Sequence, residues 1–242
     1  MKAMIFAAGL GTRLKPLTDT MPKALVPVGG SPLLDILMKR LLQAGVTEVV
    51  INVHHFARQI KEHVQAMRQY GVQVHFSDET DMLLETGGGI KKASCFFDEP
   101  FLVHNVDILN NVDLSAFYTR GKQHAATLLV SERKTQRYLL FDDRNHLVGW
   151  TNLQTGEVKS PYPDLEVEKC KKYAFAGVHT CSPQLFPYFE QWGDRFSIID
   201  FYLSICDRED ICGDPMPGLQ IMDVGKQETL ALADDFLKNI YG

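Results

Sequence analysis

The chain lacks the regular cysteine spacing that a disulfide framework or a zinc site requires. Its five cysteines are odd in number, and no two of them form a C-x-x-C pair. Disulfide-rich secreted domains and cysteine-based zinc sites both show such regular spacings. The sequence therefore argues against both kinds of site, and a reducing compartment, the cytoplasm, fits it best.

Long apolar segments and an excess of positive charge are also missing. No stretch is long enough to span a bilayer, and the first eight residues hold one lysine and a short apolar run, unlike a signal peptide. The formal net charge is −5, so the overall field repels nucleic acid and anionic membranes. We expect neither as a partner, and any anionic ligand must be met by a local cluster of cations.

Short apolar runs alternate with helical patterns through the first half of the chain. Strands are predicted in residues 3–8, 48–53, 72–77 and 101–106. Helices are predicted in residues 33–44 and 57–70, and a glycine follows each of them. This βαβ alternation predicts an α/β fold with a Rossmann-like, doubly wound mixed sheet.

The pattern changes after a predicted helix at 114–123, which Asp113 caps. Three strands are expected to follow, in residues 125–131, 138–141 and 146–151. Short turns join them, which predicts a small antiparallel insertion in the sheet. The rest of the chain is predicted to hold a helix opened by Ser182-Pro183, a last buried strand at 219–224 and a closing helix at 228–240.

A glycine-rich turn follows the first predicted strand. It reads Ala-Ala-Gly-Leu-Gly-Thr-Arg over residues 7–13 and lies beyond the carboxyl end of the strand, where doubly wound sheets bind ligands. Gly9 and Gly11 let backbone N–H groups approach phosphate oxygens, and Arg13 adds a planar fork of donors. Lys23 brings a second cation on a proline-stiffened loop. Two cations in this place suit a triphosphate from which pyrophosphate leaves.

Two better-known glycine motifs do not fit this turn. A dinucleotide fingerprint needs a third glycine where this chain has Leu14, and an acidic residue after the next strand, where His54-His55 stands instead. The phosphate loop G-x-x-x-x-G-K-[ST] does not occur. The remaining alternative is that the glycines only turn the chain, and the pair of Arg13 and Lys23 favours phosphate binding over it.

The turn and the segment after it resemble the signature of the sugar-1-phosphate nucleotidyltransferases. The matching residues are Ala7-Ala8-Gly9-x-Gly11-Thr12-Arg13 with Pro16 and Thr18, then Pro22-Lys23-x-Leu25-x-Pro27-Val28. Residues 84–89, Leu-Glu-Thr-Gly-Gly-Gly, are similar to short enzymes of the N-acetylmuramate 1-phosphate uridylyltransferase and mannose-1-phosphate guanylyltransferase type. The resemblance covers most of residues 1–107 and returns at 220–229. Ala24 departs from it, because the family usually has a second proline there.

This resemblance implies the fold and the nucleotide site of the family. The fold would be of the nucleotide-diphospho-sugar transferase type, one domain over 1–242 with a nucleotide-binding half (1–124) and a sugar-binding half (125–242). The implied nucleotide-binding residues are Ala7, Ala8, Gly9, Gly11, Thr12, Arg13, Lys23, Glu85, Thr86, Gly87 and Gly88. The alternative for the glycines of 85–89 is a flexible turn without a ligand.

Two aspartates are candidate metal ligands. Transfer of a phosphoryl-type group needs charge neutralisation, usually by Mg²⁺ held through one or two carboxylates. Asp107 and Asp223 each follow an apolar run, and they match the family's metal-binding aspartates. The resemblance thus implies Mg²⁺ as the cofactor and Arg13, Lys23, Asp107 and Asp223 as the catalytic residues. Val106 stands where the family has glycine, and a side chain there can impose a different backbone angle.

The sugar side of the site is less marked in the sequence. Gly177, in Phe-Ala-Gly-Val, matches a glycine that the family uses for the sugar. Glu168-Lys169 resembles a sugar-binding pair of some members, but it lies in a charged run and is interpreted as a solvated face. His54-His55 is interpreted as surface or hydrogen-bonded histidines, and Trp150 as a core residue.

The main hypothesis is an enzyme that joins a nucleoside triphosphate, UTP or GTP, to a sugar 1-phosphate and releases pyrophosphate. The expected partners are these two substrates, and the expected state is a monomer or homodimer. The nearest alternative is the same chemistry on a non-sugar phosphate such as phosphocholine. A second alternative is a non-catalytic regulatory relative, suggested by Val106.

Overall fold

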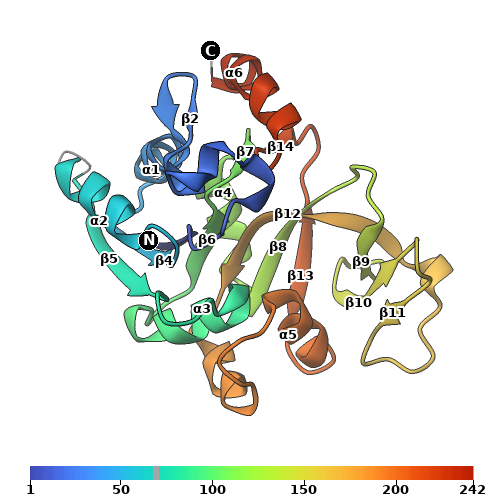
Figure 1. Cartoon of the computed structure of the whole chain (residues 1–242). Coiled ribbons are helices and arrows are strands. Elements are labelled where there is room, and N and C mark those ends of the chain that lie inside the picture. The colour runs from blue at the N-terminus through green and yellow to red at the C-terminus, as the bar shows by residue number, and fades with distance from the viewer. Residues whose placement is uncertain (68–70, 242) are drawn as a thin grey trace.

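A mixed sheet forms the centre of the computed structural model, which describes residues 1–67 and 71–241 (Figure 1). Within these residues ten strands belong to it. They are β1 Lys2–Phe6, β4 Glu48–Val53, β5 Gln73–Asp78, β6 Phe101–Asn105, β8 Ala126–Ser131, β9 Arg137–Phe141, β10 Leu147–Asn152, β11 Val158–Lys159, β12 Lys171–Cys181 and β13 Ile211–Pro215. The order is β11-β10-β9-β12-β6-β1-β4-β5, with β8 beside β12 and β13 beside β8.

The amino-terminal part of the sheet is parallel. Strand β1 pairs with β4 and with β6 in parallel, and β4 pairs with β5 in the same way. The carboxyl ends of these four strands therefore meet at one edge of the sheet, where open α/β sheets bind ligands. The four strands that the sequence predicts in this half are confirmed, with bounds that shift by at most two residues.

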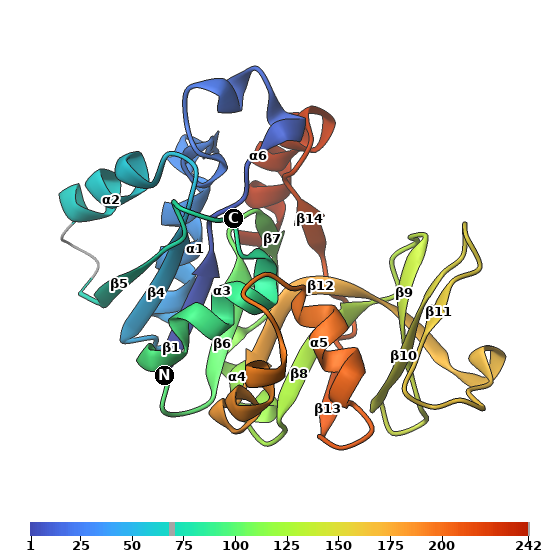
Figure 2. The same ribbon diagram turned by 60° about the horizontal axis from the view of Figure 1, so that its bottom comes forward.

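Helices cover both faces of the sheet (Figures 1 and 2). They are α1 Leu33–Gln43, α2 Ala57–Ala66, α3 Glu85–Ala93, α4 Leu114–Gly121, α5 Ile198–Ile205 and α6 Gln227–Tyr241. Side chains alternate along β1, so Ala3 and Ile5 join the core under α1 and α4, whereas Met4 joins the core under α3 and α5. This confirms the doubly wound arrangement. Within the described residues, every helix is too short or too polar to cross a bilayer.

The antiparallel insertion is confirmed for the β9–β10 hairpin, to which β11 adds a short edge (Figure 2). Strand β8, which was expected in the same insertion, instead lies in the main sheet between β12 and β13. The long strand β12 joins the two parts, because its first residues pair with β9 and its last residues pair with β6.

One expectation about local structure is wrong, and two other segments differ in detail from the sequence-based expectation. Residues 219–224 form no buried strand of the main sheet, because β14 Ile221–Asp223 is only half-buried and pairs with β7 Ile108–Asn110 in a separate two-stranded sheet. The helix opened by Ser182-Pro183 is confirmed, with Ser182 at its N-cap, but it is a 3₁₀ helix, Pro183–Gln191, with Pro187 inside it, where the ring offers no N–H for an α-helical bond. The glycines of 85–89 lie in helix α3, which excludes the alternative of a flexible turn.

The remaining helix expectations fit closely. Asp113 caps α4, because its side chain accepts a hydrogen bond from the amide of Ala116 at 2.9 Å. The predicted helix at 57–70 is observed as α2 over Ala57–Ala66, and residues 68–70 lie outside the described part of the chain. A last short sheet pairs β2 Pro27–Val28 with β3 Ser31–Pro32 beside α1.

Two histidines are enclosed in the sheet where β6 pairs with β12. His104 and His179 are both buried, and burial lowers the pKa of each to about 3. His104 contacts the Asn110 side chain at 3.0 Å, whereas neither ring nitrogen of His179 has a hydrogen-bond partner among the described residues. The fold therefore holds both rings in the neutral form.

Acidification is expected to destabilise the fold through these two rings. The unfolded chain takes up their protons below about pH 6.5 and the folded chain only near pH 3, so the free energy of unfolding falls as the pH drops through this window. At pH 5.5 the loss is roughly 1 kcal/mol per histidine relative to pH 7.5. Urea denaturation at both pH values measures the free energy of unfolding. Between pH 7.5 and 5.5 it should fall less in His179→Leu than in wild type, by the contribution of one histidine. An unchanged pH dependence would contradict this, and exposed His55→Leu is the control.

Candidate functional site

A pocket of about 570 Å³ opens at the carboxyl ends of β1, β4 and β6. It is lined by the glycine turn and Lys23, by Asp107 and its two preceding residues, and by the start of α3. The predicted site residues that line it are Ala7, Ala8, Gly9, Gly11, Thr12, Arg13, Lys23, Glu85, Thr86 and Asp107. Gly87, Gly88, Gly177 and Asp223 are not in its lining.

Packing and backbone conformation require glycine at one of the two glycine positions of the turn, Gly11, but not at the other, Gly9. Gly11 has φ 65°, and a Cβ there would lie 2.9 Å from Cγ2 of Thr18, whose hydroxyl donates to the Gly11 carbonyl at 2.7 Å. Its conformation and packing require glycine. A Cβ on Gly9 would meet nothing within 4 Å among the described residues. Packing therefore does not require Gly9, and its backbone is open to a ligand in the pocket.

A buried polar pair that the sequence analysis missed supports the turn from behind. The side-chain oxygen of Asn52 accepts hydrogen bonds from the amides of Ala7 at 2.7 Å and Ala8 at 3.3 Å. Its side-chain nitrogen donates to Glu79 at 2.8 Å, and burial raises the pKa of the Glu79 carboxyl. The Ala7 and Ala8 amides are thus already used, and they fix the turn rather than face a phosphate. The sequence does contain an indication of this role, because Asn52 is a polar residue within the otherwise apolar end of strand β4.

The four predicted catalytic residues come together beside Gly225. The ammonium group of Lys23 donates to Asp107, and Nη2 of Arg13 lies 3.9 Å from Oδ2 of Asp223. A Cβ built on Gly225 would lie 2.5 Å from Oδ1 of Asp223, 2.6 Å from Nη2 of Arg13 and 3.1 Å from Nζ of Lys23. These three charged groups therefore surround the position that a side chain at residue 225 would occupy, so only glycine fits there.

Pairing of β7 with β14 brings the two aspartates close along the backbone. Asp223 stands opposite Ile108, the residue that follows Asp107. The amide of Val224 donates to the carbonyl of Asp107 at 2.9 Å. Two segments separated by more than a hundred residues are thus held side by side at the rim of the pocket. The Asp107 side chain is 20% exposed and that of Asp223 is 45% exposed.

Valine at 106 fits without backbone strain. Val106 does not have a positive φ, its side chain is buried in the core, and its amide donates to the carbonyl of Phe6 at 3.1 Å. A left-handed conformation would have favoured glycine. Val106 therefore stands in a conformation that does not require glycine.

Helix α3 changes the interpretation of the glycines at 87 and 88. The amides of Gly87 and Gly88 both donate to the carbonyl of Phe196, at 2.9 and 3.3 Å. A Cβ on Gly88 would lie 1.9 Å from the carbonyl oxygen of Asp194. These two glycines are required by the close approach of the 194–196 segment, and their amides are not free to reach a base. The residues of this stretch that do line the pocket are Glu85 and Thr86.

Gly177 lies at an irregularity in strand β12. Its φ is 74°, and a Cβ there would lie 2.8 Å from Ile108 and 3.1 Å from the Asn105 side chain. The pairing of β12 with β8 shifts register across this residue. Glycine is thus required by conformation and by contact, and Asn105, not Gly177, borders the pocket.

The other predicted residues lie where the sequence analysis expected. Lys169 is exposed and pairs with Glu166 at 2.8 Å. Nδ1 of His54 contacts the carbonyl of Glu79 at 2.5 Å. Trp150 is partly buried and packs against the core under α3 and α5. None of these side chains lines the pocket.

Removing the Asn52 side chain is expected to loosen the glycine turn. Asn52→Ala leaves the amides of Ala7 and Ala8 and the Glu79 carboxyl without their partner, at a cost of about 1–3 kcal/mol per buried group. We expect triphosphate affinity, measured by calorimetry, to fall at least about tenfold, since about 1.4 kcal/mol equals a factor of ten. Asn152→Ala, in β10, is the matched control. Equal affinities for wild type and Asn52→Ala would refute this role.

The packing account of Gly88 makes a separate prediction. Gly88→Ala forces a Cβ against the backbone of Asp194, and overpacking of this kind typically costs about 1–3 kcal/mol. The Tm should fall by several degrees, since about 1 kcal/mol shifts Tm by roughly 2–4 °C in a chain of this size. Gly193→Ala, where a Cβ meets nothing within 4 Å, should keep the wild-type Tm. A loss of ligand affinity with an unchanged Tm would mean that Gly88 contacts the ligand instead.

Known proteins share this architecture. HddC from Yersinia pseudotuberculosis, solved in complex with GMP-PN, superposes with a TM-score of 0.76 at 22% identity, over 98% of this chain and 99% of that one. The inositol-1-phosphate CTP transferase from T. maritima superposes with a TM-score of 0.76 at 16% identity, over 99% and 95%. At these identities the likeness establishes the fold.

Sequence comparison is more specific. N-acetylmuramate alpha-1-phosphate uridylyltransferase from Caulobacter vibrioides is 32% identical over an alignment that covers 96% of this chain and 95% of that protein. The enzyme of the same name from Neisseria meningitidis serogroup B is 47% identical over 119 residues, 49% of this chain and about half (52%) of that protein. The family model described as nucleotidyl transferase matches residues 2–138. The chain therefore belongs to the nucleotidyl transferase family.

Proposed function

We propose that this chain transfers a uridylyl group from UTP to N-acetylmuramate 1-phosphate, releasing pyrophosphate. The broader activity, nucleotidyl transfer to a sugar 1-phosphate, is that of the relatives it matches. The choice of base and sugar rests on the Caulobacter vibrioides relative, which aligns over nearly the whole chain. We place the reaction in the cytoplasm, where thiols stay reduced. Residues 1–124 would provide the nucleotide-binding half and residues 125–242 the sugar-binding half.

The observation that carries this proposal is the convergence of two cations and two carboxylates around Gly225. Lys23 contacts Asp107 and Arg13 approaches Asp223, on the side of the pocket formed by the glycine turn. A triphosphate needs cations, and a divalent metal needs carboxylates. This rim of the pocket supplies both within one small volume.

Asp107 and Asp223 are suited to hold Mg²⁺. Their hard carboxylate oxygens are the ligands that this ion prefers, and both groups are matched by positive charge in the present structure. The bound ion would neutralise charge on the reacting phosphates. Substrate phosphates and water would complete its coordination, because a protein usually contributes only one or two carboxylates to Mg²⁺.

The residues of the chain then have distinct tasks. A phosphate oxygen of the sugar 1-phosphate attacks the α-phosphorus in line, and the bond to the pyrophosphate oxygen breaks. Arg13 and Lys23 stabilise the negative charge that develops on the departing pyrophosphate. The turn at Gly9 lets the chain approach the phosphates closely, while Thr86 and Glu85 line the pocket at the start of α3. The attacking group is already an anion, so the transfer needs no covalent enzyme intermediate and no general base.

A matrix of pyrophosphate-release assays tests the proposal. Four triphosphates are combined with N-acetylmuramate 1-phosphate, glucose 1-phosphate, mannose 1-phosphate and phosphocholine. We expect the highest kcat/KM for UTP with N-acetylmuramate 1-phosphate. GTP with mannose 1-phosphate as the best pair would overturn the substrate choice, and phosphocholine as the best acceptor would overturn the sugar class. Ligand binding with no turnover for any pair would identify a regulatory protein.

The catalytic assignment is tested with charge-neutral variants. Lys23→Met and Asp107→Asn each remove one charge next to the reacting phosphates, and loss of one such electrostatic contact costs about 10²–10³ in kcat. Asp207→Asn, an exposed aspartate after α5, is the matched control. Full activity of Asp107→Asn at saturating Mg²⁺ would contradict the assignment.

A further inference from the structure

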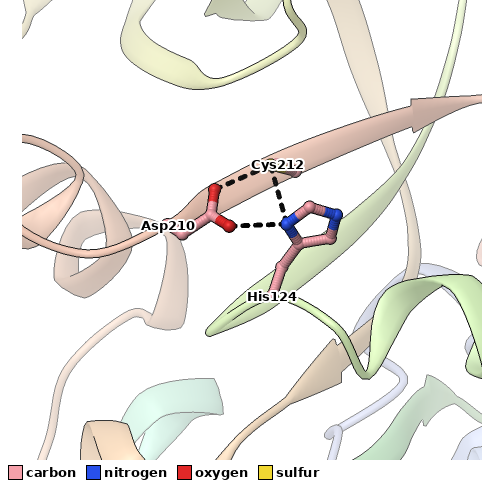
Figure 3. A group of neighbouring side chains, drawn as sticks. All are labelled: His124, Asp210 and Cys212. Carbon is pink, nitrogen blue, oxygen red and sulfur yellow. Dashed lines mark hydrogen bonds and ion pairs between the residues drawn. The ribbon is translucent and has the colours of Figure 1, made fainter.

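A second group of reactive side chains lies at the opposite edge of the sheet. It consists of His124, Asp210 and Cys212, named here the His–Asp–Cys cluster, and their ligand atoms all lie within 4.8 Å of one another (Figure 3). His124 lies just before β8, and Cys212 is the second residue of β13. Because β8 runs in the same direction as β6, the start of β8 is at the edge away from the pocket.

The three side chains point at one another. Oδ2 of Asp210 lies 2.6 Å from Nδ1 of His124, and Sγ of Cys212 lies 3.1 Å from Oδ1 of Asp210 and 3.5 Å from Nδ1 of His124. A metal with bonds of about 2.0–2.1 Å to nitrogen and about 2.3 Å to sulfur separates its ligand atoms by a little over 3 Å. The observed spacings require only a small opening between Asp210 and His124.

A second histidine extends the cluster from a different part of the chain. Nε2 of His146, in the β9–β10 hairpin, lies 3.5 Å from Oδ1 of Asp210. Its other ring nitrogen, Nδ1, lies 3.3 Å from Oδ2 of Asp142. A carboxylate that accepts the N–H of one ring nitrogen leaves the other with a free lone pair, which is the usual support of a metal-bound histidine. In the zinc-bound state, a proton on Nδ1 would donate to Asp142 and leave Nε2 of His146 as the ligand atom on the side of Asp210.

The backbone holds these ligands in place. The amide of Ala125 donates to the carbonyl of Asp210 at 3.0 Å, and the amide of Gly213 donates to the carbonyl of Asn145 at 2.8 Å. His146 and Cys212 also form an antiparallel β-bridge. The backbones of the three segments are therefore fixed by pairing, whereas the ring of His146, which lies outside the 4.8 Å group, must turn toward His124 and Cys212 to complete the site.

We propose that His124, Asp210, Cys212 and His146 form a structural zinc site that fastens the β9–β10 hairpin to strands β8 and β13. The donor set of two imidazoles, one thiolate and one carboxylate fits zinc in tetrahedral geometry. Mg²⁺ and Ca²⁺ prefer oxygen donors throughout. Side-chain exposures of 36% for His124 and 47% for Asp210 leave a path for the ion to enter.

A nucleophilic Cys–His–Asp triad is the rival interpretation of the same residues. Cys212 is only 6% exposed and does not line the pocket. Asp210 and Cys212 both contact Nδ1 of His124, whereas the acid and the nucleophile of a triad contact opposite ring nitrogens. Regular cysteine spacing does not reveal this site, because its ligands include a single cysteine and come from positions 124 to 212 along the chain.

Zinc binding by the full-length protein tests the proposal. The protein is stripped with a chelator, equilibrated with Zn²⁺ in excess Mg²⁺ to occupy the carboxylates of the nucleotide pocket, passed through gel filtration and analysed for metal. We expect one retained zinc per chain in wild type and in the control Cys95→Ser, which changes an exposed cysteine, and none in Cys212→Ser. In Co²⁺-loaded protein, thiolate-to-metal absorption should appear in wild type and vanish in Cys212→Ser.

Two further variants complete the test. One shows whether loss of zinc could result from misfolding, and the other removes the carboxylate that contacts Nδ1 of His146. His124→Gln changes a partly exposed side chain and should also abolish retention, with circular dichroism of the metal-free protein unchanged. Asp142→Asn should weaken zinc affinity by about 10- to 100-fold, the usual effect of losing a carboxylate behind a ligand. Less than one zinc per wild-type chain, or equal retention by Cys212→Ser and wild type, would overturn the proposal.

Discussion

Two charge pairs at the carboxyl edge of the sheet hold the site together. Lys23 is 8% exposed, and such a buried ammonium is stable only beside a carboxylate, which Asp107 supplies. Arg13 and Asp223 repeat the arrangement at the more exposed rim. Without substrate, each cation balances a carboxylate. In our account the triphosphate binds Arg13 and Lys23, and Mg²⁺ binds Asp107 and Asp223. The two ligands therefore favour each other's binding, because together they leave no cation and no carboxylate without an opposite charge.

The topology explains why residues so far apart in sequence share this edge. Parallel strands β1, β4 and β6 deliver the glycine turn, Asn52 and Asp107 to the same side of the sheet. The chain then builds the second half of the sheet and returns as β14, which pairs with β7 directly after Asp107. The opposite edge holds the His–Asp–Cys cluster, where the inserted hairpin meets the sheet. One edge thus carries the reaction proposed here, and the other anchors the insertion.

Local patterns in the sequence predict the parallel half well, because most of its strands are apolar runs and its helices are amphipathic. The family is confirmed, and Val106 proves compatible with an unstrained backbone. Interactions between distant segments could not be predicted. The sequence predicts that Gly88 binds the nucleotide, and only the fold shows that the carbonyl of Asp194 packs against it. Likewise, the half-buried strand β14, the 3₁₀ helix after Ser182 and the convergence of His124 with Cys212 depend on tertiary contacts that spacing does not encode.

The account depends most directly on Asp107 and Asp223 acting on one ion. A crystal structure with Mg²⁺ and a non-hydrolysable UTP analogue measures this. We predict a single ion bound to both carboxylates, with Lys23 moved from Asp107 to the phosphates and Arg13 at the pyrophosphate end of the analogue. An ion held by the phosphates alone, with Lys23 still on Asp107, would contradict the account.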